Sequence, residues 1–198
     1  MKNVYDLFMA PFEKRGLSRA RREILQQTQG DVLEIGGGTG VNLTHYPYDQ
    51  MSSLLIVDTN LSEAMQTRAK EKEFACPVSL LEMNVEELPF EGQTFDTIVV
   101  TLVFCSVDDV EKGLRQIRRV LKDDGMLLFM EHVLPEKNPL RKIFGQVSPL
   151  WERMASGCHL NRDFASSLKE NGFQIENMTT CMKSVFICGT AKKTRNFS

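Results

Sequence analysis

Short apolar runs alternate with stretches of helical periodicity along most of this chain. Seven runs have the length and the aliphatic or aromatic content of β-strands. They lie at residues 32–35, 54–57, 78–83, 95–104, 126–133, 173–179 and 185–190. Positions 98–100 are all apolar, which is typical of a central strand covered on both faces.

Helices are expected between most of these runs. The pattern predicts a short helix at 41–45 and longer helices at 60–74, 108–125 and 161–171. Asn60 or Ser62 can cap the second of these helices, and Asp108-Asp109 can cap the third. Strands that alternate with helices in this way predict an α/β domain with a mostly parallel sheet.

Two segments stand outside this alternation. Residues 1–29 look helical in two pieces broken near Pro11, and positions 14–22 are rich in basic side chains. This basic cluster is either a solvated helix face or a surface that docks weakly on an anionic membrane. Residues 134–160 contain three prolines, but their aromatic and aliphatic content favours an ordered, functional insertion. Residues 193–198 are expected to be frayed.

Composition limits the class of protein. The 198 residues, of which 42% are hydrophobic and 25% charged, make one globular domain of ordinary size. A net charge of −2 gives no support for nucleic acid as a partner. No apolar run approaches the roughly 20 residues of a membrane span, and the N-terminus lacks a signal-peptide core, so a cytoplasmic location is expected. The five cysteines form no C-x-x-C pair, so neither a disulfide framework nor a metal site is suggested.

The candidate chemistry begins where the first strand ends. Gly36, Gly37, Gly38 and Gly40 follow that strand directly, and glycine there lets backbone N–H groups approach a ligand closely. Asp58 closes the second strand, 22 positions after Gly36. In a βαβ unit this spacing places a carboxylate where it can accept hydrogen bonds from both ribose hydroxyls. A nucleoside-containing cofactor is the leading inference, and a tight turn without a ligand is the alternative.

The order of the glycines distinguishes between cofactors. A dinucleotide fingerprint requires a glycine at the sixth position from Gly36, where this chain has Val41. Instead Gly40 lies at the fifth position, and Glu34 lies two residues before the first glycine. The order Glu-x-Gly-x-Gly-x-Gly resembles motif I of the class I S-adenosylmethionine (SAM) methyltransferases. A nicotinamide cofactor stays open, because Val41 alone does not exclude it.

The resemblance implies a set of cofactor-binding residues and a fold. It places the glycines near the methionyl part of SAM and Asp58 at the ribose, and it adds Glu34 and Thr59 to the cofactor-binding residues. Asn84, where the family usually has Asp, and the backbone of Val85 would meet the adenine edge, and Thr101 would line the site at a strand exit. The implied fold is a Rossmann-like, doubly wound sheet of seven strands, mostly parallel, with an antiparallel closing hairpin.

Four stretches resemble one subgroup of that family, the animal methyltransferase-like thiol S-methyltransferases. They are residues 33–36, 101–107, 129–133 and 146–162. Members of the subgroup are anchored in membranes at the N-terminus, and this chain has no such anchor, so a soluble relative is implied.

By the resemblance, residues 30–192 form the methyltransferase domain. Residues 1–29 form an N-terminal lid in which Tyr5 covers SAM, and residues 134–160 form a substrate-side insertion. Residues 193–198 remain outside the domain as a frayed tail.

Methyl transfer from SAM, with S-adenosylhomocysteine as product, is an in-line displacement that gains most from alignment and exclusion of water. We predict a small acceptor, first of all a thiol, with His132 as the general base. A purely structural His132 is the alternative. Cys105, Trp151, His159 and Arg162 are further candidates on the acceptor side. A quinone- or lipid-directed enzyme on a membrane surface, and a non-catalytic SAM-binding protein, stay open, as does a monomer or a dimer.

Overall fold

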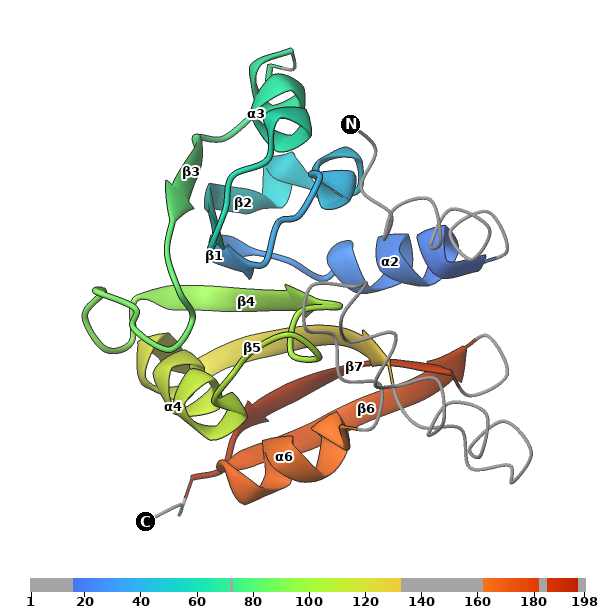
Figure 1. The fold of residues 1–198 in the computed structure, drawn as a ribbon, viewed down its shortest axis with the longest axis vertical. Helices are drawn as coiled ribbons and strands as arrows, with labels where there is room; N and C mark the ends of the chain where they lie inside the picture. The colour runs from blue at the N-terminus through green and yellow to red at the C-terminus, as the bar shows by residue number, and fades with distance from the viewer. Residues whose placement is uncertain (1–15, 72, 133–161, 182–184, 196–198) are drawn as a thin grey trace.

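The computed structural model describes residues 16–71, 73–132, 162–181 and 185–195 (Figure 1). The described helices are α2 (Ser18–Leu25), α3 (Glu63–Lys70), α4 (Val110–Val120) and α6 (Phe164–Glu170), with 3-10 turns at Val41–Thr44 and Tyr48–Gln50. The strands are β1 (Gly30–Ile35), β2 (Met51–Asp58), β3 (Val78–Glu82), β4 (Phe95–Thr101), β5 (Leu121–His132), β6 (Phe173–Cys181) and β7 (Phe186–Lys193).

These strands form one sheet in the order β3-β2-β1-β4-β5-β7-β6. The pairs from β3 to β5 are parallel, and β7 runs antiparallel to both β5 and β6. Strand order reverses direction between β1 and β4, so the connections that leave their carboxyl ends run in opposite directions. Ligands bind at such a point in open α/β sheets. The predicted doubly wound sheet of seven strands with an antiparallel closing hairpin is confirmed.

The sheet separates two apolar layers. Helices α4 and α6 cover one face, where Ile117 packs among the buried residues around Leu33. Helices α2 and α3 cover the other face, where Leu25 and Met65 pack around Val32. Neighbouring residues of β1 thus belong to opposite layers, because side chains alternate along a strand. Covering both faces explains why the central strands are almost wholly apolar.

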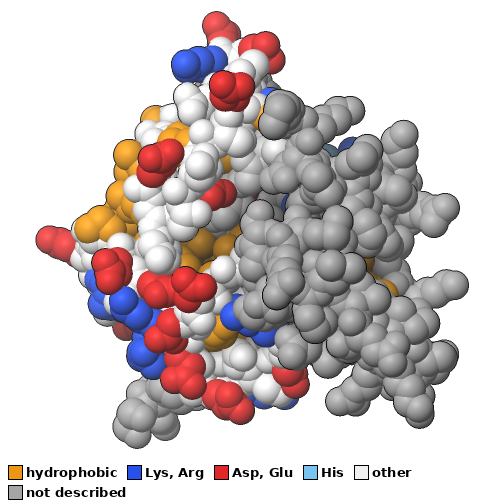
Figure 2. Space-filling view, viewed as in Figure 1, with side chains coloured by type: hydrophobic (Ala, Val, Ile, Leu, Met, Phe, Trp, Pro, Cys, Tyr) orange, Lys and Arg blue, Asp and Glu red, His pale blue; other side chains and the backbone are white. Residues whose placement is uncertain are grey.

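Short polar side chains fix where the helices begin. Ser62 caps α3 by accepting a hydrogen bond from the backbone of Met65, and Asp109 caps α4 by accepting one from Lys112. Both residues are among the caps expected from the sequence. On the face shown in Figure 2, acidic and basic side chains are interspersed around α4, and apolar side chains are exposed near β3, where Leu81 is 42% exposed.

The helix expected at 108–125 is wrong at its C-terminal end. Helix α4 stops at Val120, and Leu121 is already extended and paired with Phe95 of β4. The β4–β5 ladder then shifts register before Met126, and the ammonium of Lys122 donates to Asp96 across the shift at 2.8 Å. Leu121 continues the helical spacing of the buried face, so periodicity alone assigns it to the helix.

None of the described helices is both long and apolar enough to cross a membrane. The parts of the chain described here also hold no group of three or more His, Cys, Asp or Glu side chains that could bind a metal ion.

Candidate functional site

The glycine turn lies against the exits of two other strands. Gly36 has a φ of +74°, and a Cβ there would approach Val103, just after β4, to 2.2 Å. A Cβ on Gly37 would come within 2.1 Å of Met65 in α3 and 2.5 Å of Ile56 in β2. A side chain at either position would displace the turn or these neighbouring side chains, which explains the glycines physically.

The turn and Asp58 form one structural unit. The backbone N–H of Gly38 donates to the Asp58 carboxylate at 2.8 Å, and the N–H of Asn60 donates to its other oxygen at 3.1 Å. A Cβ built on Gly38 would meet nothing within 4 Å, so open space lies beside this backbone. Backbone donors, a carboxylate and open space at the ends of β1 and β2 fit the ribose and methionyl parts of SAM.

Glu34 lies beneath the turn in a buried polar network. Its carboxylate is 1% exposed and accepts hydrogen bonds from the Asn42 amide at 2.7 Å and the Tyr46 hydroxyl at 2.8 Å. The Asn42 amide also donates to Thr101 at 3.0 Å, and the Asn42 oxygen accepts from Arg21 of α2 at 2.7 Å. Glu34 and Thr101, both predicted from the sequence, are therefore held by protein groups that link the turn to α2 and β4.

Burial controls the ionisation of this network. It raises the pKa of Glu34 to about 7, against the opposing effect of hydrogen bonds from Tyr46 and Asn42 and of the positive charge of Arg21. Burial and the Glu34 carboxylate raise the pKa of the Tyr46 phenol well above its ordinary value. Glu34 can therefore change its protonation state near neutral pH, directly under the glycine turn.

The predicted adenine segment leaves the sheet after β3. The Asn84 side-chain oxygen accepts from the N–H of Glu86 at 3.0 Å and so closes a local turn. Val85 follows with 5% exposure and packs in the layer beneath α4. Thr59, next to Asp58, is exposed. The three residues thus lie after the carboxyl ends of β3 and β2.

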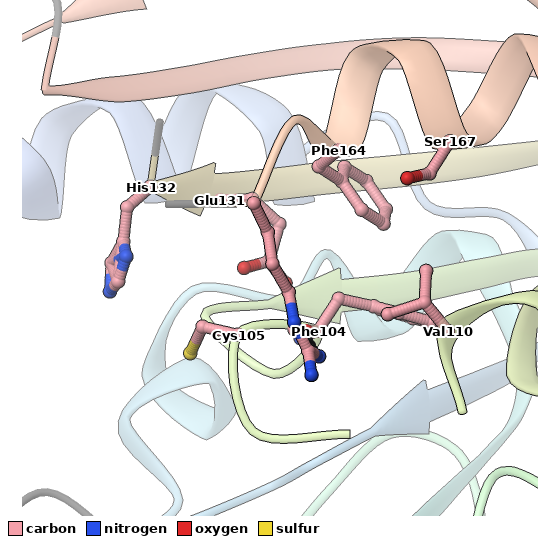
Figure 3. Close-up of a pocket in the computed structure, with 8 residues that line it drawn as sticks. Phe104, Cys105, Val110, Glu131, His132, Phe164 and Ser167 are labelled. Atoms are coloured by element: carbon pink, nitrogen blue, oxygen red, sulfur yellow. Dashed lines mark hydrogen bonds between the residues drawn. The ribbon is translucent and has the colours of Figure 1, made fainter. Parts of the chain in front are cut away.

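A small pocket lies beyond the ends of β4 and β5 (Figure 3). Its walls combine three apolar side chains with a cysteine and four polar or ionisable side chains. The lining residues are Phe104, Cys105, Val110, Glu131, His132, Arg162, Phe164 and Ser167. Three residues that the sequence suggested for the acceptor side, Cys105, His132 and Arg162, therefore line one pocket.

His132 ends β5 with 9% exposure, and its ring packs edge-on against Phe186 at a centroid distance of 5.6 Å. Burial lowers the pKa of His132 to about 4. The imidazole is consequently neutral at physiological pH. It is also a weaker base than its ordinary pKa of about 6.5 would make it.

Arg162 precedes α6 and points toward the segment after β4. Its guanidinium donates to the backbone carbonyls of Phe104 and Val107. Tyr5, Trp151 and His159 lie outside the described residues, as do most of the predicted lid and the whole 134–160 insertion.

Sequence reasoning missed four residues of this site. Arg21, Asn42 and Tyr46 complete the network around Glu34, and Glu131 lines the pocket next to His132. A signal existed only for Glu131, because an acid at the end of a strand lies at the ligand edge of the sheet. The other three occupy helix or turn positions whose side-chain directions depend on the tertiary fold.

The chain is similar in sequence to known proteins. Residues 33–129 match the family model described as a methyltransferase domain. The chain is 31% identical over 180 residues to thiol S-methyltransferase TMT1B of Mus musculus, covering 82% of this chain and 72% of that relative. It is 31% identical over 121 residues to the ubiquinone/menaquinone biosynthesis C-methyltransferase UbiE of Shewanella frigidimarina, covering 59% of this chain and 48% of that protein.

The fold is also similar to that of solved structures. A crystal structure of a SAM-dependent methyltransferase from Mesorhizobium loti matches with a TM-score of 0.64 at 18% identity, covering 88% of this chain and 96% of that one.

Proposed function

Because the chain belongs to the class I SAM-dependent methyltransferases, for which SAM is the cofactor, we propose that it methylates a small thiol. The similarity to thiol S-methyltransferase TMT1B supports a thiol over an oxygen or carbon acceptor. The three apolar side chains of the pocket beside the strand ends, Phe104, Val110 and Phe164, suit the apolar part of a small acceptor.

The observation that carries the cofactor part of this proposal is the hydrogen bond of 2.8 Å that the Gly38 N–H donates to Asp58. It brings together the two walls expected to hold the methionyl and ribose parts of one nucleoside cofactor. Thr59, Asn84 and Val85 would complete the ribose and adenine sides. SAM supplies an electrophilic methyl group on a sulfonium. The chain's task is to align that group with the acceptor and to exclude water.

A thiol suits the groups that the pocket offers. With an ordinary pKa of about 8.5, a thiol is partly ionised near neutral pH and needs only modest activation. Neutral His132 can accept a hydrogen bond from the thiol and so orient the sulfur lone pair. Its depressed pKa makes full proton removal unfavourable, so as a general base it would have to pass the proton on to water. Trp151, His159 and Tyr5 remain proposed contacts on the acceptor and lid side.

Titration calorimetry with S-adenosylhomocysteine tests the cofactor site. The parent should bind, and Asp58→Ala should weaken binding about tenfold to a hundredfold, because a carboxylate that accepts ribose hydrogen bonds is lost. Asp123→Ala is the matched control, since Asp123 pairs with Lys193 in the register shift near the start of β5, away from the carboxyl ends of the strands. Absence of binding by the parent, or equal binding by Asp58→Ala, would contradict the proposal.

A screen with methyl-labelled SAM tests the acceptor. Small thiols, phenols and quinones should be offered to the parent and to His132→Gln, which keeps a hydrogen-bond acceptor, and to His132→Phe, which does not. We expect transfer to thiols, retained in part by the Gln variant and lost by the Phe variant. Cofactor binding without transfer to any compound would instead identify a non-catalytic SAM-binding protein.

A second candidate is a quinone- or lipid-directed methyltransferase that docks on membranes through residues 1–22. The similarity to UbiE and the exposed Arg19 and Arg22 of α2 favour it. The pairing of Arg19 with Glu23 at 2.8 Å reduces the net positive charge of this face. Salt-sensitive co-sedimentation with anionic vesicles, together with methylation of a quinone rather than a thiol, would support this second function.

A further inference from the structure

The segment that follows β4 is held in an unfavourable backbone conformation. Leu102 has a φ of +59°, in the left-handed region that non-glycine residues rarely adopt. Its N–H donates to Met130 of β5 at 2.7 Å, so the chain is still tied to the sheet at this point. A residue in such a conformation persists only where its surroundings hold it, and such residues gather at functional sites.

Glu131 holds the next two residues through their backbone N–H groups. Its carboxylate is 1% exposed, and one oxygen accepts the N–H groups of Val103 at 2.8 Å and Phe104 at 3.0 Å. Consecutive N–H groups that converge on one anion form a nest, and the left-handed residue before them makes this geometry possible. A carboxylate at the end of β5 thus fixes the backbone that leaves β4.

Arg162 holds the same segment through its backbone carbonyls. Its guanidinium donates to the carbonyls of Phe104 and Val107, and the segment is closed by a hydrogen bond of 2.8 Å from Ser106 to Val103. We name residues 103–107 the acceptor turn. Every residue of this turn except Cys105 makes at least one of these backbone contacts.

The acceptor turn supplies two residues to the pocket wall. The Phe104 ring is 1% exposed and packs on Phe164 of α6 at a centroid distance of 5.1 Å, which anchors the turn. Cys105 is presented next to it, and its side chain and that of His132 lie on the same side of the pocket (Figure 3). The position of this wall therefore depends on the two charged groups that grip the turn.

We propose that Glu131 and Arg162 are positioning residues for the methyl acceptor: they lock the acceptor turn so that Cys105 and Phe104 form a fixed wall of the pocket that contains His132. This inference rests on the proposed function, because it concerns the acceptor half of the same site. Neither residue needs to touch the reacting atoms. Their role is to keep the acceptor in line with the methyl group, where small displacements reduce the rate strongly.

The chain offers a matched control. Arg118 of α4 also donates to two backbone carbonyls, those of Gly172 at 3.4 Å and Thr194 at 3.3 Å. These carbonyls lie at the ends of β6 and β7 that are remote from His132. Arg118→Gln thus removes the same kind of contact away from the acceptor turn.

The test compares Arg162→Gln, Arg162→Lys and Arg118→Gln, with thiophenol as the acceptor. For Arg162→Gln we expect the KM for thiophenol to rise about tenfold and kcat to fall. The dissociation constant for S-adenosylhomocysteine should stay within about twofold of the parent value. Arg162→Lys can still donate to a carbonyl, so its KM and kcat for thiophenol should lie between those of the parent and those of Arg162→Gln. Arg118→Gln should leave all three constants unchanged.

Glu131 is tested in the same assay. Glu131→Gln keeps an oxygen that can accept both N–H groups, so its KM and kcat for thiophenol should stay near the parent values. Glu131→Met should change these two constants as Arg162→Gln does. Unchanged thiophenol constants in both Arg162→Gln and Glu131→Met would overturn the proposal. An equal loss of S-adenosylhomocysteine binding would overturn it too, because it would indicate a general structural role.

Labelling of Cys105 separates this inference from the proposed function. The thiol is 5% exposed, so iodoacetamide should modify it slowly in the parent, as followed by peptide mass spectrometry. In Arg162→Gln the rate at Cys105 should rise at least fivefold, while the rate at buried Cys188 should not change. Absence of methyl transfer to thiophenol by the parent would refute the thiol acceptor, but not the positioning of the acceptor turn by Glu131 and Arg162. An unchanged rate of Cys105 modification in Arg162→Gln would refute that positioning role.

Discussion

Two buried glutamates illustrate how differently this protein builds the two halves of its site. Glu34 and Glu131 are each 1% exposed and lie at the carboxyl ends of parallel strands. Glu34 accepts hydrogen bonds from side chains 8 and 12 residues away in the sequence. Glu131 accepts them from backbone N–H groups 28 and 27 residues away, in a connection that belongs to another strand.

This difference suggests that the cofactor half and the acceptor half of the site differ in how freely their hydrogen-bond partners can move. The partners of Glu34 can rearrange, because an amide and a phenol rotate, and its protonation can change near neutral pH. The two backbone N–H groups that donate to Glu131 cannot rotate, because the path of the chain fixes them. The cofactor half is therefore expected to adjust to charge, whereas the acceptor half is expected to be rigid.

The largest expected effect comes from removing the acceptor-side carboxylate. Glu131→Ala leaves the N–H groups of Val103 and Phe104 without that acceptor and should lower the free energy of unfolding by about 2–4 kcal/mol. Urea denaturation measures the loss. Glu131→Gln, which retains an acceptor, should recover most of it. A loss in Glu131→Ala no larger than that of a typical surface substitution would remove the contrast with Glu34.

The next effect concerns pH and the cofactor side. The pKa of Glu34 rises from 4.5 in the unfolded chain to about 7 in the fold, so the native state binds more protons between these values. Stability should therefore fall as pH rises from 4.5 to 7. Glu34→Gln should remove about 2–3 kcal/mol of this pH dependence. Urea denaturation at pH 5 and pH 7.5 measures the free energy of unfolding of parent and variant. An equal change of that free energy with pH in both would contradict the prediction.

The acceptor side should show the opposite dependence. The pKa of His132 falls from 6.5 to about 4 on folding, so the unfolded chain binds more protons between these values. Stability should be lost as pH falls from 6.5 toward 4, and His132→Gln should reduce that loss by about 2 kcal/mol. The same denaturation series down to pH 4.5 measures it. If His132→Gln steepened the acid loss, the imidazole would be charged in the fold.

The smallest effect tests how the glycine turn is tied to α3. Ser62 caps the helix and also donates to the carbonyl of Gly38 at 2.7 Å. Ser62→Ala should cost about 1 kcal/mol of stability and weaken S-adenosylhomocysteine binding a few-fold. Asp109→Ala removes an equivalent cap from α4 and should lower stability without changing that affinity. If Ser62→Ala and Asp109→Ala bound S-adenosylhomocysteine equally well, the Ser62 cap would have no influence on the cofactor site.

Sequence patterns predicted the fold and the cofactor half better than the acceptor half. The glycine turn and Asp58 follow directly after apolar strands, and parallel strands bring their ends together by geometry. The end of α4 was misplaced because Leu121 fits a buried helix face and a buried strand equally well. Local periodicity does not contain the pairing with Phe95 that decides between them.

The network around Glu34 and the grip on the acceptor turn could not be predicted in the same way. Arg21 meets Asn42 only after α2 packs on the sheet, and Arg162 meets the acceptor turn only after α6 packs on α4. Sequence suggested Arg162 only as a candidate on the acceptor side, and the structure turns its guanidinium toward two backbone carbonyls. Side-chain direction at such positions depends on contacts that are distant in sequence.

The place of β7 in the sheet has a consequence for biosynthesis. It is the last of the seven strands to leave the ribosome, yet it lies in the interior between β5 and β6, with Phe186 opposite His132. A nascent chain released before residue 186 would leave both neighbours with unsatisfied edges that invite aggregation. The acceptor half must therefore mature after translation of the closing strand, whereas the sheet around the glycine turn can assemble earlier.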